Sequence, residues 1–469
     1  MNSQKRRIGF AMVLWASLAG CAVDGALPGT PSSAPGDDAG GVPQDSSLTP
    51  SHLAPSAGPV AFERVSVDFT GGGESAAQRE QREVRVEAQR VVESVARRQI
   101  IPLAEGGYAL DSWDAVRANA AARGITWNYP WGVTLYGLLR ATAATGDRSY
   151  ADFVTRHNEI IGRTYGYLRD VDARYGAEHR REVDDMLRRA PVLGAVTLGS
   201  LDNCGAMSSQ ILEGAQRQGA PLTSGQSTLM SAVGDYISSR QSRLPDGAFW
   251  RPEWAQTLWI DDLFMSCPFL VRWARQTGDS RYLDDAARQI IAFARRQQDR
   301  DGLWFHASFV GADRVAPFKW GRANGWAMVA TVEVLSALPE SHPDRARVLD
   351  ILRRHIEGVK RLQASSGRWH QVLDHAELWD ETSCTAMFTY SIARAVSRGW
   401  IPREDLSVAM RGLRGLGERV ARDGAISDVC EGTVIGQDLD YYATRAHPIN
   451  DVHGPGPVLL AATEVLLAL

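Results

Sequence analysis

Apolar residues recur at helical spacing through most of the chain beyond about residue 60. One such stripe consists of Trp131, Leu135, Leu138 and Leu139. Intervals of three and four residues place these side chains on one face of a helix. Alternating polar and apolar positions, which are typical of strands, are nearly absent. The pattern therefore predicts an all-α fold.

Two similar junctions mark corners between helices. Residues 144–150 read Ala-Thr-Gly-Asp-Arg-Ser-Tyr, and residues 276–282 read Gln-Thr-Gly-Asp-Ser-Arg-Tyr. In each, the glycine suits a left-handed helix end, and the aspartate suits the cap of the next helix. Similar breaks elsewhere divide the chain into roughly a dozen helices. Because no fixed short repeat is present, a closed toroid of helical hairpins is favoured over an open solenoid.

The beginning of the chain resembles a bacterial lipoprotein signal. A basic start at residues 5–7 precedes an apolar stretch of about eleven residues, which is shorter than the roughly twenty that span a membrane. Residues 18–21 read Leu-Ala-Gly-Cys, which resembles the lipobox. We therefore expect residues 1–21 to direct export, and Cys21 to carry the lipid that anchors the protein at a membrane, in the periplasm or at the cell surface. Ordinary signal cleavage is the alternative.

Two regions follow this signal. Residues 22–60 are rich in Pro, Gly, Ser, Ala and Asp, a composition that predicts a flexible tether. Residues 61–469 contain no second linker, so a single large domain is expected. The net charge of −4 and a pI of about 6.2 give no basic surface of the kind that nucleic acid requires.

Four cysteines lie in the expected domain, and none has the close spacing of a paired motif. They are Cys204, Cys267, Cys384 and Cys430. Buried free thiols are therefore expected, with disulfides as the alternative in an exported protein.

Tryptophan is abundant, with 14 residues in the chain. Many stand beside Gly, Asn, Asp or His near the expected helix ends, as in residues 127–131, 249–251, 320–326 and 367–370. An aromatic face beside hydrogen-bonding groups suits a sugar ring. Core packing is the alternative for any single Trp, but the clustering indicates a carbohydrate site.

Two carboxylates, Asp202 and Asp261, lie in apolar surroundings. Burial away from water raises the pKa of a carboxyl group, which can then donate a proton near neutral pH. A helix cap or a buried ion pair is the alternative for each. The sequence contains no phosphate-binding loop, dinucleotide-binding glycine pattern, HExxH or GxSxG motif, so neither a cofactor nor a metal is expected.

Five segments, in order, resemble glycoside hydrolase family 105, the unsaturated rhamnogalacturonyl hydrolases, which are related to the unsaturated glucuronyl hydrolases of family 88. These segments are residues 259–265, 319–327, 367–372, 381–383 and 442–454. The resemblance extends over residues 78–469 and implies a catalytic (α/α)6 toroid without metal. The implied substrate is an oligosaccharide that ends in a 4,5-unsaturated uronic acid, which is the product of a polysaccharide lyase.

The resemblance also implies roles for individual residues. Asp261 would be the general acid/base and Asp202 a second acid, with Asn203 as the alternative to Asp202. The candidate substrate-binding residues are Tyr129, Trp250, Arg251, His306, Trp320, Arg322, Asn324, Trp326, His370 and His453. Arg322 is expected to bind the uronate carboxylate through two parallel hydrogen bonds. A structural role is the alternative for each histidine.

The chain departs from the family at two of its positions. Asp262 follows the acid/base where many relatives carry Gly, and Arg251 follows a Phe-Trp pair where some relatives carry His. An inward-pointing Asp262 would raise the pKa of Asp261; a side chain that faces solvent is the alternative. The departure at Arg251 bears on the subsite contacts, and hence on the identity of the substrate.

The implied reaction is hydration of an enol ether, in which Asp261 protonates C4 and water adds at C5. Three other functions also fit such a toroid. An inverting glycosidase would use two acids on a saturated glycan, and a polysaccharide lyase would use a Tyr or His base. A non-catalytic surface lipoprotein would only bind the glycan.

Overall fold

The computed structural model describes residues 74–119, 122–254, 256–312 and 314–469. Within this part, one compact unit extends from Ser75 to Leu469. The predicted signal at residues 1–21, the lipobox Cys21, the tether at residues 22–60 and the expected start of the domain at residue 61 lie outside the described residues.

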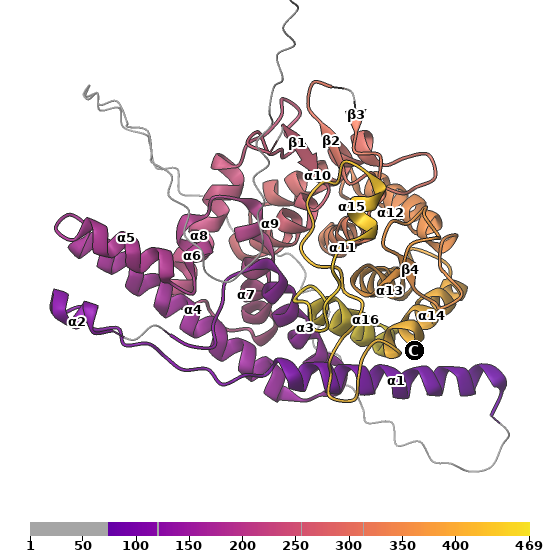
Figure 1. Cartoon of the computed structure of the whole chain (residues 1–469), viewed down its shortest axis with the longest axis horizontal. Coiled ribbons are helices and arrows are strands. Elements are labelled where there is room, and N and C mark those ends of the chain that lie inside the picture. Colours follow the sequence, from indigo (N-terminus) through magenta and orange to yellow (C-terminus); the bar gives the residue numbers. More distant parts are fainter. Residues whose placement is uncertain (1–73, 120–121, 255, 313) are drawn as a thin grey trace, which may run out of the picture. The chain divides into compact units, whose positions relative to one another are not determined.

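Six helices form a closed inner ring, in which each contacts the next and the last contacts the first (Figure 1). In ring order they are α3 (Tyr129–Thr145), α7 (Gly205–Gln218), α9 (Asp262–Thr277), α11 (Gly321–Ala337), α13 (Thr382–Ser397) and α16 (Pro455–Ala468). Residues on all sides of these helices are buried, as expected for helices without a polar face.

Six further helices pack outside the ring, each against one or two of the inner helices. They are α1 (Ala76–Gln99), α4 (Arg148–Tyr175), α8 (Ser224–Asp235), α10 (Arg281–Gln297), α12 (Arg345–Lys360) and α14 (Leu406–Gly417). These helices are amphipathic: in α10, Ile290 and Phe293 are buried whereas Arg295 faces outward. Outer and inner helices alternate along the chain, which is the (α/α)6 arrangement predicted from the sequence.

The predicted hairpin corners are confirmed. Gly146 and Gly278 end α3 and α9 in the left-handed conformation, with φ of 76° and 75°. Asp147 caps α4 by accepting from the backbone N–H of Ser149. Asp279 likewise accepts from the N–H of Arg281, at the start of α10.

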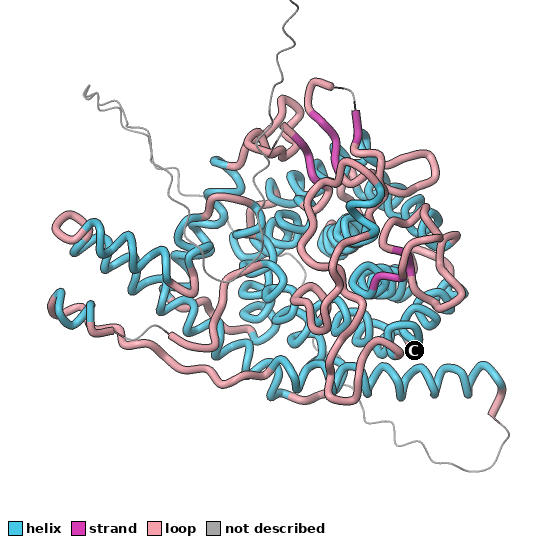
Figure 2. The backbone as a smooth tube through the Cα atoms, viewed as in Figure 1, coloured by secondary structure: helices cyan, strands magenta, loops and turns pink. Residues whose placement is uncertain are grey.

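Short elements connect the main helices. The short helices are α2 (Trp113–Arg117), α5 (Arg180–Arg189), α6 (Leu193–Thr197), α15 (Leu439–Ala443), the 3₁₀ turns η1 (Leu201–Asn203) and η3 (Arg403–Asp405), and the π-helical turn η2 (Tyr236–Arg240). The strands are β1 (Thr257–Trp259), β2 (Ala307–Phe309), β3 (Arg314–Val315), β4 (Trp369–His370) and β5 (Asp380–Glu381). Strands β1, β2 and β3 form one antiparallel sheet, and β4 pairs with β5 (Figure 2). The sequence did not predict these strands, which are only two or three residues long.

A buried network of ion pairs joins all six inner helices near their C-terminal ends. Its members are Tyr136 and Arg140 of α3, Glu213 of α7, Arg272 of α9, Glu333 of α11, Tyr390 and Arg394 of α13, and Glu464 of α16. Arg272 lies 2.7 Å from Glu213 and 2.7 Å from Glu333. Three arginines balance three glutamates, so the network satisfies buried charges that would otherwise be costly.

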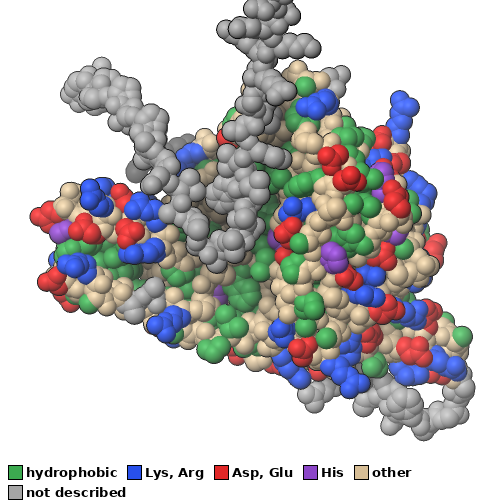
Figure 3. All heavy atoms as spheres, viewed as in Figure 1, with side chains coloured by type: hydrophobic (Ala, Val, Ile, Leu, Met, Phe, Trp, Pro, Cys, Tyr) green, Lys and Arg blue, Asp and Glu red, His purple; other side chains and the backbone are tan. Residues whose placement is uncertain are grey.

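Three further findings concern the surface charges, the cysteines and membrane-spanning helices. Basic and acidic side chains are interspersed over the face shown in Figure 3. All four cysteines within residues 74–469 are buried and free, as expected. Among the described helices, none is long and apolar enough to cross a membrane.

Candidate active site

The main candidate residues gather where the inner helices begin. Tyr129 starts α3, Asp261 stands directly before α9, and His453 lies two residues before α16. Asp202 lies in η1, just before α7. Because inner and outer helices alternate, the inner helices run in the same direction and their N-termini share one end of the toroid. The partial positive charge at these helix ends stabilises carboxylates.

Asp261 faces His306. The Oδ2 atom of Asp261 lies 3.5 Å from Nε2 of His306, and neither atom has a hydrogen-bond partner within the described structure. The Asp261 side chain is only 13% exposed and His306 is fully buried. The predicted acid/base is thus a secluded carboxyl group next to an imidazole.

The tautomer of His306 follows from its other neighbour. Nδ1 of His306 lies 2.8 Å from the hydroxyl of Tyr442, and that hydroxyl accepts from the N–H of Gly436 at 2.9 Å. Since the Tyr442 oxygen already accepts, its proton is available for Nδ1. Nε2 therefore carries the ring proton and presents it to Asp261.

Arg251 connects the second predicted acid to the residue after the first. Its guanidinium donates to both oxygens of Asp202, at 2.9 and 3.2 Å, and to Asp262, at 2.5 and 3.1 Å. The same group lies over the ring of Trp259 at 4.8 Å. Asp202, and not the alternative Asn203, makes these contacts with Arg251.

The environment of Asp202 differs from the expectation, whereas Asp262 points inward, as one of its two alternatives had it. Asp202 was expected to be kept away from water, but its side chain is 36% exposed and paired with Arg251. Asp262 is fully buried. Burial raises the pKa of Asp262 to about 6, against the opposing effect of Arg251. The apolar sequence around Asp202 did not reveal the ion pair because Arg251 lies 49 positions away.

Tyr129 belongs to a second hydrogen-bonded chain. Its hydroxyl lies 2.6 Å from Nε2 of His453, and Nδ1 of His453 lies 2.6 Å from Asp451. Burial lowers the pKa of His453, with Arg322 acting in the same direction. Burial also raises the pKa of Tyr129, so a neutral phenol faces a neutral imidazole at the start of α3.

Aromatic rings line the same end of the toroid. Trp326 stacks on Phe264 with ring centres 4.5 Å apart, and Tyr129 meets its edge. Trp259 packs against His306 and against Trp254. Trp254 is 43% exposed to solvent, whereas Trp259 is buried. The described site thus combines acids with apolar ring faces, as a sugar site requires.

Several predicted contact residues have structural roles. Arg322 is 1% exposed and donates to the carbonyls of Cys430 and Glu431. Asn324 is fully buried, and its amide binds Trp304 and Trp320. The expectation that Arg322 grips a uronate directly is thus not supported, because its terminal nitrogens are already engaged. The same reasoning removes Asn324 from the substrate contacts.

Three other predicted residues lie in the surrounding framework. Trp320 is buried, donates to Gln371 and packs on His306. His370 contacts Asp380 at 2.9 Å. Trp250 is half-buried against the core. Of these, only Trp320 touches a residue of the acid site in the contacts described for the chain.

Sequence reasoning missed Tyr442, Asp451 and Trp254 as site residues. Only Asp451 had a local signal, because it lies two positions before His453 and can orient its ring. Tyr442 reaches His306 across 136 positions, and no local pattern shows such a contact.

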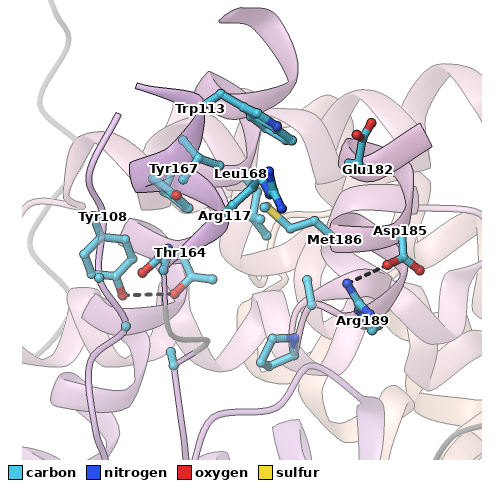
Figure 4. Close-up of a pocket in the computed structure, with 17 residues that line it drawn as sticks. Tyr108, Trp113, Arg117, Thr164, Tyr167, Leu168, Glu182, Asp185, Met186 and Arg189 are labelled. Atoms are coloured by element: carbon cyan, nitrogen blue, oxygen red, sulfur yellow. Dashed lines mark hydrogen bonds and ion pairs between the residues drawn. The ribbon is translucent and has the colours of Figure 1, made fainter. Parts of the chain in front are cut away.

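A separate cavity of about 390 Å³ lies between the segment around Gly107, helix α4 and helix α5 (Figure 4). Tyr108, Trp113, Tyr167 and Met186 form its apolar walls. None of the candidate site residues lines it. Among the described residues, no cluster of three or more His, Cys, Asp or Glu side chains is arranged to hold a metal ion.

The arrangement of acids at one end of an (α/α)6 toroid can be compared with known proteins. Residues 112–469 match the model of Glycosyl Hydrolase Family 88. The chain belongs to this family. The resemblance seen in the sequence is therefore confirmed, and family 88 membership makes the chain a glycoside hydrolase.

Individual relatives agree with this family 88 assignment. The unsaturated rhamnogalacturonyl hydrolase YesR of Bacillus subtilis is 25% identical over 358 residues, covering 72% of this chain and 90% of that protein. An unsaturated 3S-rhamnoglycuronyl hydrolase of an Alteromonas species is 29% identical over 220 residues, covering 45% of this chain and 51% of that protein. The chain thus spans about half the length of the Alteromonas relative.

Solved structures show the fold. A possible family 105 member from Salmonella enterica superposes with a TM-score of 0.61, at 21% identity, over 82% of this chain and 94% of that chain. At this identity the likeness concerns the fold alone, and it agrees with the toroid described above.

Proposed function

We propose that this family 88 member removes the terminal 4,5-unsaturated uronic acid from oligosaccharides that a polysaccharide lyase has produced. The observation that carries the proposal is Asp261, a secluded carboxyl group 3.5 Å from a fully buried His306 at the helix-start end of the toroid. The names of the Bacillus and Alteromonas relatives support the same substrate class. Rhamnogalacturonan-like and pectin-like products are the first substrates to test.

In the proposed reaction, Asp261 gives its proton to C4 of the enol ether. The C4=C5 double bond is lost, and positive charge develops at C5 and the ring oxygen. Water adds at C5 and returns a proton to a carboxylate of the site. The resulting hemiketal opens, and the rest of the oligosaccharide leaves as an alcohol. General acid–base assistance of this kind contributes about 10²–10⁴-fold to the rate.

The side chains around Asp261 suit these steps. The Nε2–H group of His306 faces the Asp261 carboxylate that remains after proton transfer, and stabilises it. The carboxyl group of Asp202 is partly exposed, and so can accept a hydrogen bond from a sugar hydroxyl. The rings of Tyr129 and Trp254 offer apolar surface to the sugar, whereas the buried Trp326 supports Tyr129 from behind.

The test uses the ultraviolet absorbance of the conjugated enol-ether carboxylate. Lyase digests of pectin, ulvan and glycosaminoglycans are incubated with the protein, and saturated oligosaccharides from acid hydrolysis of the same polymers serve as controls. Loss of absorbance on one digest supports the proposal and identifies the substrate class. Cleavage of the saturated controls would indicate an ordinary glycosidase instead. Binding without turnover would indicate a glycan-binding protein.

We also propose that Cys21 is lipidated and holds the protein at a membrane outside the cytoplasm. The Leu-Ala-Gly-Cys sequence at residues 18–21 and the tether-like composition of residues 22–60 support this. Cells grown with a labelled fatty acid should yield labelled protein in the membrane fraction. Cys21→Ser should abolish the label, and an equal label in both proteins would contradict the proposal.

A further inference from the structure

Arg251 is held on three sides. Its Nη1 and Nη2 atoms form a parallel pair of hydrogen bonds with Asp202, and its Nε and Nη2 atoms bind Asp262. Its flat face lies on Trp259. A planar guanidinium bound in this way has one orientation. The carboxylate that it binds is therefore also fixed in orientation.

The two carboxylates differ in exposure. Asp262 has no exposed surface, whereas the Asp202 side chain is 36% exposed. Asp262 therefore anchors the guanidinium from the protein interior, and Asp202 is the outer partner. Both oxygens of Asp202 accept from Arg251, and their remaining lone pairs can accept from a further donor at the exposed side.

We propose that Arg251 and Asp262 are positioning residues, which hold Asp202 as an oriented acceptor for a hydroxyl group of the bound sugar. In this arrangement Asp261 alone delivers the proton, and Asp202 contributes to binding. This inference rests on the proposed function, because it assigns roles to residues in the same reaction.

Titratable groups approach this unit from several elements. They are Tyr129 of α3, Cys204 before α7, Tyr236 of η2, Asp261 before α9 and His306 before β2. Arg251 is the cation in contact with Asp202 and Asp262. Loss of its charge should therefore change the pH dependence of the reaction.

The first test is a double-mutant cycle on KM with the digest that the wild-type protein turns over. Asp202→Asn and Arg251→Met should each raise KM about 10- to 100-fold, the range for loss of a hydrogen bond to a charged group. The double variant should be no worse than Asp202→Asn, because Arg251 acts through Asp202. Additive effects would overturn the inference.

The second test is the pH profile of kcat/KM. Arg251→Met removes a positive charge and should shift the profile to higher pH by about one unit, whereas Asp262→Asn removes a negative charge and should shift it to lower pH. Shifts in the same direction, or none, would overturn the inference. Arg251→Lys keeps the positive charge but lacks the planar guanidinium with its paired N–H donors. KM should therefore rise, while the pH profile of kcat/KM should not shift. This variant also serves if Arg251→Met does not fold.

Arg243 provides a matched control. It binds both oxygens of Asp285 at 2.9 and 2.7 Å and lies over the ring of Phe249 at 4.3 Å. Arg243→Met should lower stability and leave KM and the pH profile unchanged. If the Arg251 and Asp262 variants behave in the same way, their role is structural and the inference is wrong. A wild-type protein that acts on no unsaturated oligosaccharide would instead contradict the proposed function.

Discussion

The Nε2 atom of His306 lies 3.5 Å from Oδ2 of Asp261, and both atoms are buried without another hydrogen-bond partner in the described structure. The distance is slightly too long for a strong hydrogen bond. A small movement on substrate binding would form that bond, and it would be strongest once Asp261 is ionised. The pair is thus suited to stabilise the state that follows proton transfer.

Tyr442 tests this relationship, because its hydroxyl fixes the tautomer of His306. Tyr442→Phe should lower kcat about tenfold through the loss of one buried hydrogen bond, with little change in KM. Steady-state kinetics on the digest measure both constants. Tyr441→Phe is the neighbouring control. A kcat equal to that of the wild type would show that the Tyr442 hydrogen bond does not support Asp261.

Trp254 is expected to contact substrate beyond the unsaturated sugar. It is 43% exposed and packs edge-on against Trp259. Trp254→Ala should raise KM about fivefold for longer oligosaccharides, since stacking on an aromatic ring contributes about 1 kcal/mol, and should leave kcat unchanged. An equal effect on disaccharides and longer chains would place Trp254 beside the first sugar instead.

The buried network of ion pairs should account for much of the cohesion of the ring. Glu333→Gln leaves Arg272 without one of its two buried partners and should lower the free energy of unfolding by about 3 kcal/mol. Urea denaturation measures this loss. Glu340→Gln, at an exposed position shortly after α11, should change stability by less than about 0.5 kcal/mol. Equal stability of the two variants would contradict this role.

The same network predicts how the stability of the fold decreases at acidic pH. Burial alone would raise the pKa of Glu333, but Arg272 and Arg394 outweigh it and lower the pKa to about 2 from an ordinary value of 4.5. The pKa values of Glu213 and Glu464 are lowered in the same manner. Stability from these groups is present above pH 4.5 and is lost as the pH falls towards 2. Melting temperatures across this range should fall less steeply in Glu333→Gln than in the wild type.

The contribution of Asp262 to stability depends on pH in the opposite direction. Its pKa is raised to about 6, so its contribution to stability is lost as the pH rises through 6. The melting temperature of Asp262→Asn should therefore change less between pH 5 and 7 than that of the wild type. Identical slopes would show that Asp262 does not titrate in this range.

The helical class and the hairpin corners were predictable because they depend on local periodicity and on glycine conformation. The (α/α)6 toroid followed from the family resemblance. The predicted residues Asp261 and Tyr129 lie at the same end of the toroid because each stands at the start of an inner helix. Arg322 and Asn324 were misjudged as direct contacts, since polar residues beside tryptophans can equally bind the backbone around them. Arg251 and Asp262, the two departures from the family, contact each other, and only the structure brings the two together.

The central claim is that Asp261 protonates the enol ether. The most direct measurement is the rate of absorbance loss on one active digest, with wild-type protein and Asp261→Asn at equal folded concentration verified by circular dichroism. We predict steady loss with the wild type and at least about a hundredfold slower loss with the variant. Comparable rates in a folded variant would contradict the assignment and place the proton donor elsewhere in the site.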